Sequence, residues 1–326
     1  MAIIINKDLD IKRLKESNIN YILKPTKEPI YSKNRLNILI LNLMPKKQES
    51  EFDLLKCFPS KNDYDIDFTF LKLQTHKYKN TNISYLDDNY LSFEDIKDLN
   101  FDGFIMTGAP IEHLDFLDIY YFDELKKIFS YVKNHIKSRI YICWAAQAFL
   151  YNEFNVDKKL KDDKIFGFFK HFIHNSFLFD GINDINLDEF YIPHSRYSYN
   201  LNIDLKNIKN LNIIAQSNSV ADIAIAEINN YKDILFFGHL EYDNLTILNE
   251  FIRDIDAKKN INIPSNYFVD NFVDKSSKKT VDKIKNLKNN NSYTHVNNIL
   301  KKYIINYNHL KYNKIIYKNW IEFLKD

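Results

Sequence analysis

The chain has 326 residues, and its 45 basic and 43 acidic side chains leave a formal net charge of only +2. This balance gives no strong field for nucleic acid, and we find neither a signal-peptide pattern nor an apolar run near the roughly 20 residues of a membrane span. With 45% hydrophobic residues the chain can bury a large core, so we expect a globular, cytoplasmic protein that binds small molecules rather than nucleic acid or membrane.

Glycine and cysteine are both scarce. There are 5 glycines, whereas the average usage of about 7% would give roughly 23. We therefore expect the remaining glycines at positions where backbone geometry requires them. They are Gly103, Gly108, Gly167, Gly181 and Gly238. The two cysteines, Cys57 and Cys143, are too few for a disulfide framework, and we expect both to be thiols.

The first 268 residues predict strands that alternate with helices. The apolar run at 36–45 is typical of a buried parallel strand, and residues 48–58 have helical spacing with acidic residues in the first turn. Further strands are predicted at 65–73, 101–106, 138–143, 211–217, 221–228 and 233–239, and further helices at 92–99, 119–136, 144–154 and 243–255. This order predicts an α/β fold with a doubly wound, mostly parallel sheet and helices on both faces.

The composition changes after residue 268. Residues 276–298 are rich in Lys and Asn with little periodicity, which predicts a solvated loop or a partly ordered extension. Residues 308–324 have the apolar spacing of a final helix. We therefore divide the chain into an N-terminal extension packed on the core at 1–35, an α/β domain at 36–268 and a C-terminal extension at 269–326.

Cys143 lies where the strand at 138–143 gives way to a helix. Ligands of open α/β sheets bind at this carboxyl edge, and the helix N-terminus favours a thiolate. Ala145 and Ala146 are small, as a tight strand-to-helix elbow with a nucleophile requires. Taken alone, however, a cysteine after a strand is as well explained by core packing.

His239 and Glu241 follow the strand at 233–239, so they should share a sheet edge with Cys143. A cysteine nucleophile needs a base within hydrogen-bond reach, and a third group that fixes the tautomer of this base. Separately, His239 could be a capping or exposed histidine and Glu241 an acid in the first turn of a helix. Their joint occurrence with Cys143 favours a catalytic triad.

At these residues the sequence resembles the homoserine O-acyltransferases of the MetA type. The matching segments follow one another through nearly the whole chain. They are LNLMPKK (41–47), DGFIMTGAPIEHLDF (102–116), CWAAQA (143–148), DKIFGFFKH (163–171), PHSRYS (193–198), GHLEYD (238–243), FIRD (251–254), PSNYF (264–268) and a terminal NW (319–320). The resemblance implies a class I glutamine-amidotransferase-like, or flavodoxin-like, core. It also implies that Cys143 is the nucleophile, His239 the general base and Glu241 the supporting carboxylate.

The reaction implied by the resemblance is a ping-pong acetyl transfer in methionine biosynthesis. An acetyl group passes from acetyl-CoA through a Cys143 acyl-enzyme to the γ-hydroxyl of L-homoserine, which gives O-acetyl-L-homoserine and CoA. We expect no cofactor and no metal, and the partners are the two substrates and a second copy in a homodimer. The oxyanion needs two donors. We assign the backbone N–H of Trp144 and, because Pro45 has no N–H, a group of Lys46 or Lys47, of which we choose Lys47.

The resemblance also implies the residues that select the substrates. Lys164, Ser195 and Arg253 match positions that hold the amino-acid substrate, and Arg253 can bind an α-carboxylate through two parallel N–H bonds. Glu112 matches the position that separates acetyl-CoA users from succinyl-CoA users. A glutamate there fills space and repels the carboxylate of a succinyl group, which favours acetyl-CoA.

Three alternatives remain beside this interpretation. The same reaction could use succinyl-CoA, which Glu112 disfavours. The protein could be a glutamine amidotransferase, which uses the same kind of triad but usually has glycine two residues before the cysteine, where this chain has Tyr141. It could also be a non-catalytic α/β binding protein, which would make the joint presence of Cys143, His239 and Glu241 a coincidence.

Overall fold

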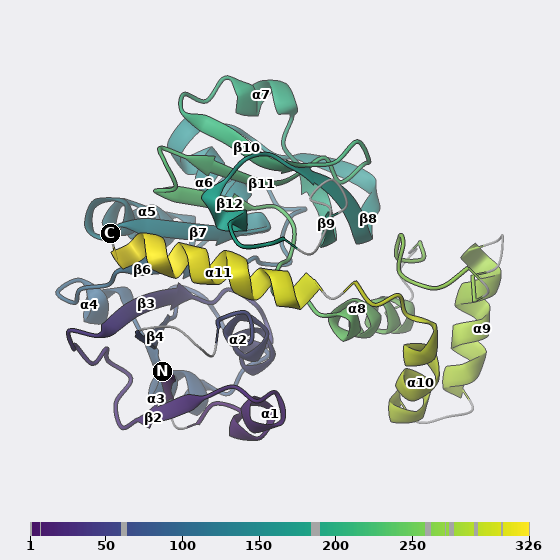
Figure 1. Cartoon of the computed structure of the whole chain (residues 1–326), viewed down its shortest axis with the longest axis horizontal. Helices are drawn as coiled ribbons and strands as arrows, with labels where there is room; N and C mark the ends of the chain where they lie inside the picture. Colours follow the sequence, from purple (N-terminus) through teal and green to yellow (C-terminus); the bar gives the residue numbers. More distant parts are fainter. Residues whose placement is uncertain are drawn as a thin grey trace.

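The computed structural model describes residues 2–6, 8–59, 64–183, 190–257, 262–270, 272–273, 277–289, 293–307 and 309–325. Within these ranges one sheet runs through the molecule (Figure 1). Its strand order is β2 (Tyr21–Lys24), β1 (Ile3–Asn6), β4 (Asp65–Leu71), β3 (Arg35–Leu41), β6 (Gly103–Met106), β7 (Ser138–Ile142), β12 (Asp233–Phe236), β11 (Ile223–Ile228), β10 (Leu211–Gln216), β8 (Lys159–Ile173) and β9 (Phe190–Tyr199), with β5 (Tyr90–Leu91) beside β4. The predicted α/β fold with a mostly parallel sheet is confirmed.

The direction of pairing changes at β12. Every pair from β2 to β12 is parallel, whereas β12 with β11, β11 with β10, β10 with β8 and β8 with β9 are antiparallel. The expectation that helices separate the strands throughout was therefore wrong for this part. Short connections such as the turn at 229–231, whose three residues have positive φ, can join antiparallel strands only.

Helices cover both faces of the sheet (Figure 1). One apolar core lies beneath α1 (Ile11–Glu16), α2 (Lys47–Leu55), α3 (Ile83–Asn89) and α11 (His309–Lys325). The other lies beneath α4 (Phe93–Ile96), α5 (Phe122–His135), α6 (Trp144–Phe154) and α7 (Asn202–Lys206). The helix predicted at 144–154 is confirmed with the same bounds, and those predicted at 48–58, 92–99 and 119–136 are confirmed with fewer residues. A Ser92–Asp95 capping box begins α4.

Helix α11 crosses the face of the parallel strands (Figure 1). The indole N–H of Trp320 donates to Ser138 Oγ over 2.9 Å at the start of β7. Gly103 in β6 makes room for the helix, because a Cβ there would lie 2.8 Å from side-chain atoms of both Trp320 and Leu324. The predicted final helix is therefore confirmed. The side chains of Trp320 and Leu324 pack directly on the sheet.

The segment after residue 268 differs from the sequence prediction. A solvated loop or a partly ordered extension was expected over 276–298. The structure has helices α9 (Ser277–Asn289) and α10 (Tyr293–Leu300), followed by the 3-10 helix η4 (Lys301–Tyr303). Ile284, Val296 and Leu300 are buried in one apolar cluster with residues of α8 (Asn244–Asp256). Each short helix has few apolar positions, so its periodicity is weak until α8 provides the matching surface.

The division of the chain at residues 35 and 268 stays a prediction. No helix among the described residues has both the length and the apolar character needed to cross a membrane.

Candidate active site

Cys143 forms the elbow between β7 and α6. Its backbone has a φ of +54° and a ψ of −114°, and its N–H donates to Phe236 O over 2.6 Å, while α6 begins at Trp144. Such a conformation costs a non-glycine residue about 1–3 kcal/mol and persists only where the surroundings enforce it. Strands on both sides of β7 provide that enforcement, and the half-buried Cys143 lies at their carboxyl ends.

His239 and Glu241 reach the same edge from the neighbouring strand. Strand β12 pairs with β7 in parallel register, with Phe236 opposite Ile142, so the segments after both strands emerge together. His239 Nδ1 lies 2.6 Å from Glu241 Oε1, and the imidazole is hydrogen-bonded to Cys143. A carboxylate only accepts, so Nδ1 carries a proton and Nε2 is the ring nitrogen left for Cys143. The structure thus brings the three predicted residues together.

The charges around His239 favour its protonated form. Burial by itself would lower the pKa of this imidazole, but the Glu241 carboxylate and Cys143 together raise the pKa well above its ordinary value. A neighbouring imidazolium stabilises a thiolate, which is the reactive form of cysteine. The geometry can therefore support a thiolate–imidazolium pair at the carboxyl edge of the sheet.

Gly238 allows His239 to lie where it does. A Cβ at Gly238 would approach Ile192 Cγ2 to 2.5 Å and His194 Nε2 to 3.1 Å, and both neighbours are buried on β9. We predict that Gly238→Ala shifts the adjacent His239 and lowers kcat by about tenfold to 100-fold, since misplacement by about 1 Å has an effect of that size. Steady-state kinetics of acyl transfer would measure it.

Gly181 offers the matched control for this substitution. It is exposed, has a φ of +81°, and a Cβ there would meet no heavy atom within 4 Å. Gly181→Ala should lower the melting temperature because of backbone strain, but it should leave kcat unchanged. Equal kcat in the two variants would contradict the argument about His239.

The three predicted substrate-binding residues converge on one carboxylate. Lys164 Nζ lies 2.7 Å from Glu250 Oε1, Ser195 Oγ donates to the same oxygen over 2.8 Å, and Arg253 Nη2 donates to it over 3.0 Å. Lys164 and Arg253 also form ion pairs with Asp254. The resemblance did not single out Glu250. The acid stands just before the FIRD segment, and its side chain is largely buried on α8.

Electrostatics keep Glu250 ionised. Burial alone would raise the pKa of this carboxyl, but Lys164 and Arg253 lower the pKa below its ordinary range. The pKa of Lys164 is raised, because the attraction of Glu250 and Asp254 exceeds the effect of burial. The side chain of Arg253 is 60% exposed, so it lies at the solvent side of this cluster. The cluster therefore combines largely buried carboxylates and a largely buried ammonium group with one exposed guanidinium-bearing side chain.

Glu112 follows β6 and is connected to the strand that carries Ser195. Its Oε1 accepts a long hydrogen bond of 3.4 Å from the backbone N–H of Tyr197 on β9. The side chain of Tyr197 lies close enough to Glu112, Glu250 and Lys164 for their charges to affect its pKa, which burial raises. Glu112 is thus placed next to the cluster around Glu250.

The two predicted oxyanion donors differ in their relation to Cys143. Trp144 begins α6 directly after the thiol, so its backbone N–H is a helix N-terminal donor. Lys47 begins α2, and its buried ammonium lies 2.5 Å from Asn42 O; burial lowers the pKa of this amine to about 7. Among the described residues, no hydrogen bond or ion pair joins Lys47 to Cys143. The assignment of Lys47 stays a prediction.

The loop after β6 is the segment that touches the elbow. A Cβ on Gly108 would lie 3.3 Å from Cys143 Cβ and 3.8 Å from the backbone nitrogen of Trp144. Because Gly108 has no side chain, the backbone of this loop can pack directly against Cys143. The sequence identified Gly108 as one of few glycines, but it gave no sign of this contact.

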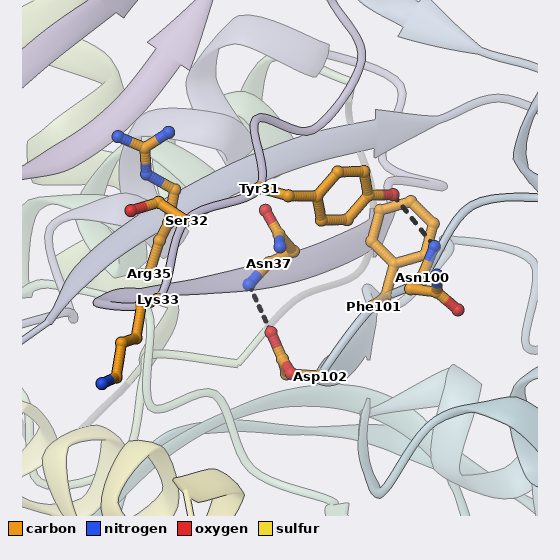
Figure 2. Close-up of a pocket in the computed structure, with 8 residues that line it drawn as sticks. All are labelled: Tyr31, Ser32, Lys33, Arg35, Asn37, Asn100, Phe101 and Asp102. Carbon is orange, nitrogen blue, oxygen red and sulfur yellow. Dashed lines mark hydrogen bonds between the residues drawn. The ribbon is translucent and has the colours of Figure 1, made fainter.

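Two hollows of about 470 Å³ lie away from the triad. One is at the amino-terminal edge of β3 and β6, where Asp102 accepts from the Asn37 N–H. Figure 2 shows that the side chains of Arg35 and Lys33 point away from each other there. The other is near the ends of β4 and β5 and includes Tyr78. Neither hollow is lined by the triad or by the cluster around Glu250.

The fold is that of the class I glutamine amidotransferase-like proteins. A glutamine amidotransferase from Methylobacillus flagellatus has the same fold, with a TM-score of 0.50 and 13% identity over 89% of this chain and 95% of that one. The sequence model of the homoserine O-succinyltransferase family matches residues 2–325, and the chain belongs to that family.

Individual relatives carry the name of the acetyl-transferring enzyme. Homoserine O-acetyltransferase 1 of Ilyobacter polytropus is 41% identical over 271 residues, which cover 83% of this chain and 88% of that protein. Homoserine O-acetyltransferase of Clostridium acetobutylicum is 41% identical over 74% of this chain and 78% of its own length. The enzyme of that name from Bacteroides thetaiotaomicron is 36% identical over 81% and 85%.

Proposed function

We propose that the protein transfers an acetyl group from acetyl-CoA to the γ-hydroxyl of L-homoserine. The names of its relatives support acetyl transfer to homoserine. The observation that supports this most is the presence of two groups of residues around Tyr242, since Cys143, Glu241 and Glu250 all lie close enough to affect the pKa of this phenol. Cys143 and His239 form a nucleophile and base, and the neighbouring cluster around Glu250 has the charges that a zwitterionic amino acid needs. A glutamine amidotransferase would use the first site but leaves Glu112 without a role.

The proposed reaction has two steps that use the same histidine. The Cys143 thiolate attacks the acetyl carbonyl, the bond to sulfur of CoA breaks, and His239 gives its proton to the leaving thiolate. The γ-hydroxyl of L-homoserine then attacks the acetyl-thioester while His239 takes the hydroxyl proton, and Cys143 leaves as thiolate. Each step passes through an oxyanion, which the backbone N–H of Trp144 at the start of α6 would stabilise.

The cluster around Glu250 would hold the amino acid through its two charged groups. Arg253 would bind the α-carboxylate, because its exposed guanidinium can turn from Glu250 and Asp254 towards a ligand. Glu250 would accept from the α-ammonium group, and Lys164 and Ser195 keep its carboxylate in place. L-homoserine would thereby replace ion pairs that the protein makes within itself.

Glu112 is the residue on which we base the choice of acyl donor. We predict turnover with acetyl-CoA that depends on L-homoserine, and little turnover with succinyl-CoA, in assays of CoA release. In Glu112→Gly, the ratio of kcat/KM for succinyl-CoA to that for acetyl-CoA should rise about tenfold or more, because space opens and a repulsive charge is lost.

Glu112→Gln is the matched control, since it removes the charge but keeps the volume. If the ratio of kcat/KM for succinyl-CoA to that for acetyl-CoA in Glu112→Gln lies between those of the unmodified protein and Glu112→Gly, part of the selectivity is due to charge. Preference of the unmodified protein for succinyl-CoA would refute the argument about Glu112 and leave the triad in place. If neither donor reacts, release of ammonia from L-glutamine is the measurement that would support the glutamine amidotransferase alternative.

A further inference from the structure

The loop that carries Glu241 is attached to the last helix of the described chain. Asn313 Nδ2 donates to the carbonyl of Leu240, and His309 Nε2 lies 2.6 Å from the carbonyl of Tyr242. These two carbonyls stand on either side of Glu241. His309 and Asn313 are four residues apart on α11, so they share one face of that helix and reach both carbonyls together.

The side chains of His309 and Asn313 are deeply buried, and each forms its hydrogen bond with this loop. His309 is 3% exposed and Asn313 is fully buried, while Asn313 Oδ1 and His309 Nδ1 have no hydrogen-bond partner among the described residues. Burial lowers the pKa of His309 to about 4, so at neutral pH the uncharged ring donates its Nε2 proton to the carbonyl. Buried polar groups with incomplete pairing are unfavourable, and apolar residues would pack here without that cost.

Helix α2 holds the same loop from another side. Lys56 Nζ lies 3.0 Å from Asp243 Oδ2 and 2.6 Å from Asp53 Oδ1, and Asp243 caps the start of α8. The N–H of His239 donates to Pro193 O over 2.8 Å. The contacts from α11 act next to Glu241 itself, at both neighbouring carbonyls. Cys57 Sγ, 3.6 Å from the Leu240 carbonyl, adds a weaker donor to one of them.

We propose that His309 and Asn313 are positioning residues of the active site. By holding the carbonyls of Leu240 and Tyr242, they keep the carboxylate of Glu241 against His239 Nδ1 and so maintain the thiolate–imidazolium pair with Cys143. This inference rests on the proposed role of the triad, but it concerns residues on a helix that would otherwise be assigned to packing.

The test compares two identical exchanges on one helix. Asn313→Leu removes the donor to Leu240, whereas Asn319→Leu removes the donor to Phe177 O, Leu178 O and Asp180 O, which belong to a turn outside the site. We expect Asn313→Leu to lower kcat about tenfold or more with KM for L-homoserine within about twofold, since the reacting groups are misplaced but the substrate cluster is intact. Asn319→Leu should lower the melting temperature and keep kcat within about twofold.

A second readout does not depend on the substrates. The rate of Cys143 alkylation by iodoacetamide follows the thiolate, so its pH midpoint should rise in Asn313→Leu and stay unchanged in Asn319→Leu. It remains measurable even if the unmodified protein transfers no acetyl group, which separates failure of this inference from failure of the proposed function. Cys57 is fully buried and should react more slowly. The mass of the labelled peptide shows which of the two cysteines is alkylated.

A pair of variants at His309 guards against loss of folding at Asn313. His309→Gln keeps an N–H donor for the Tyr242 carbonyl, and His309→Leu does not. We expect His309→Gln to retain most of kcat and to keep the pH midpoint of alkylation unchanged. His309→Leu should lower kcat and raise this midpoint. Equal kcat in the two His309 variants, or losses in Asn319→Leu that match those in Asn313→Leu, would show that α11 contributes only to stability.

Discussion

Replacing Cys143 by alanine is expected to lower kcat for acetyl transfer by about 10⁴-fold or more, because single removal of a triad nucleophile has effects of this order. The loss should arise from chemistry, since the removed sulfur lies on a half-buried elbow and the strands around it stay paired. Stopped assays of CoA release would measure the rate, and a thermal melt would show that the variant remains folded.

The acyl-enzyme provides an independent check on this expectation. Incubation with acetyl-CoA alone should add one acetyl group to the peptide that contains Cys143, and addition of L-homoserine should remove it. Cys57 should carry no acetyl group, because it is fully buried and burial raises the pKa of its thiol. Full activity of Cys143→Ala, or an acetyl group on Cys57 instead, would refute the assignment of the nucleophile.

Replacing His239 by alanine should lower kcat by a similar factor, since the thiolate then loses the imidazolium that stabilises it and both steps lose their proton carrier. The effects of Cys143→Ala and His239→Ala should not add, because residues of a triad act as one unit. The double variant should therefore be no slower than the poorer single variant, as measured by the same CoA assay.

His135→Ala is the matched control for this histidine. His135 is exposed at the end of α5, where its ring stacks on Tyr131, and it lies at the opposite edge of the sheet from the triad. This substitution should leave kcat unchanged. A multiplicative loss in the double variant would mean that Cys143 and His239 act in separate steps rather than as a pair.

The triad could be predicted from the sequence because its geometry follows from local rules. Cys143 and His239 each stand after a strongly apolar strand, and the carboxyl ends of neighbouring parallel strands meet at one edge. Glu241 is two residues from His239, so no distant packing is needed to bring them together. The central parallel strands were predictable because they are short segments rich in apolar residues. Strands β1 and β2, within the predicted N-terminal extension, were not predicted.

The contacts that could not be predicted all depend on distant packing. Glu250 is an acid on an amphipathic helix, a pattern that usually indicates a solvated face, and only the folded chain brings Lys164 and Ser195 to it. Asn313 is 73 residues from Leu240, and its helix has the apolar spacing of any surface helix. Helices α9 and α10 bury their few apolar residues against α8, so their own periodicity is too weak to predict them.

The seating of α11 on the parallel strands has a consequence for the order of folding. Residues 309–325 are synthesised after every described strand. During translation the apolar sheet face around Gly103 and Ser138 therefore stays exposed to solvent until α11 has been made. Contacts of such large sequence separation form slowly. We therefore expect that a nascent chain arrested before residue 309 exposes this face to chaperones, and that its thiol at Cys143 becomes fully reactive only when the final helix has emerged.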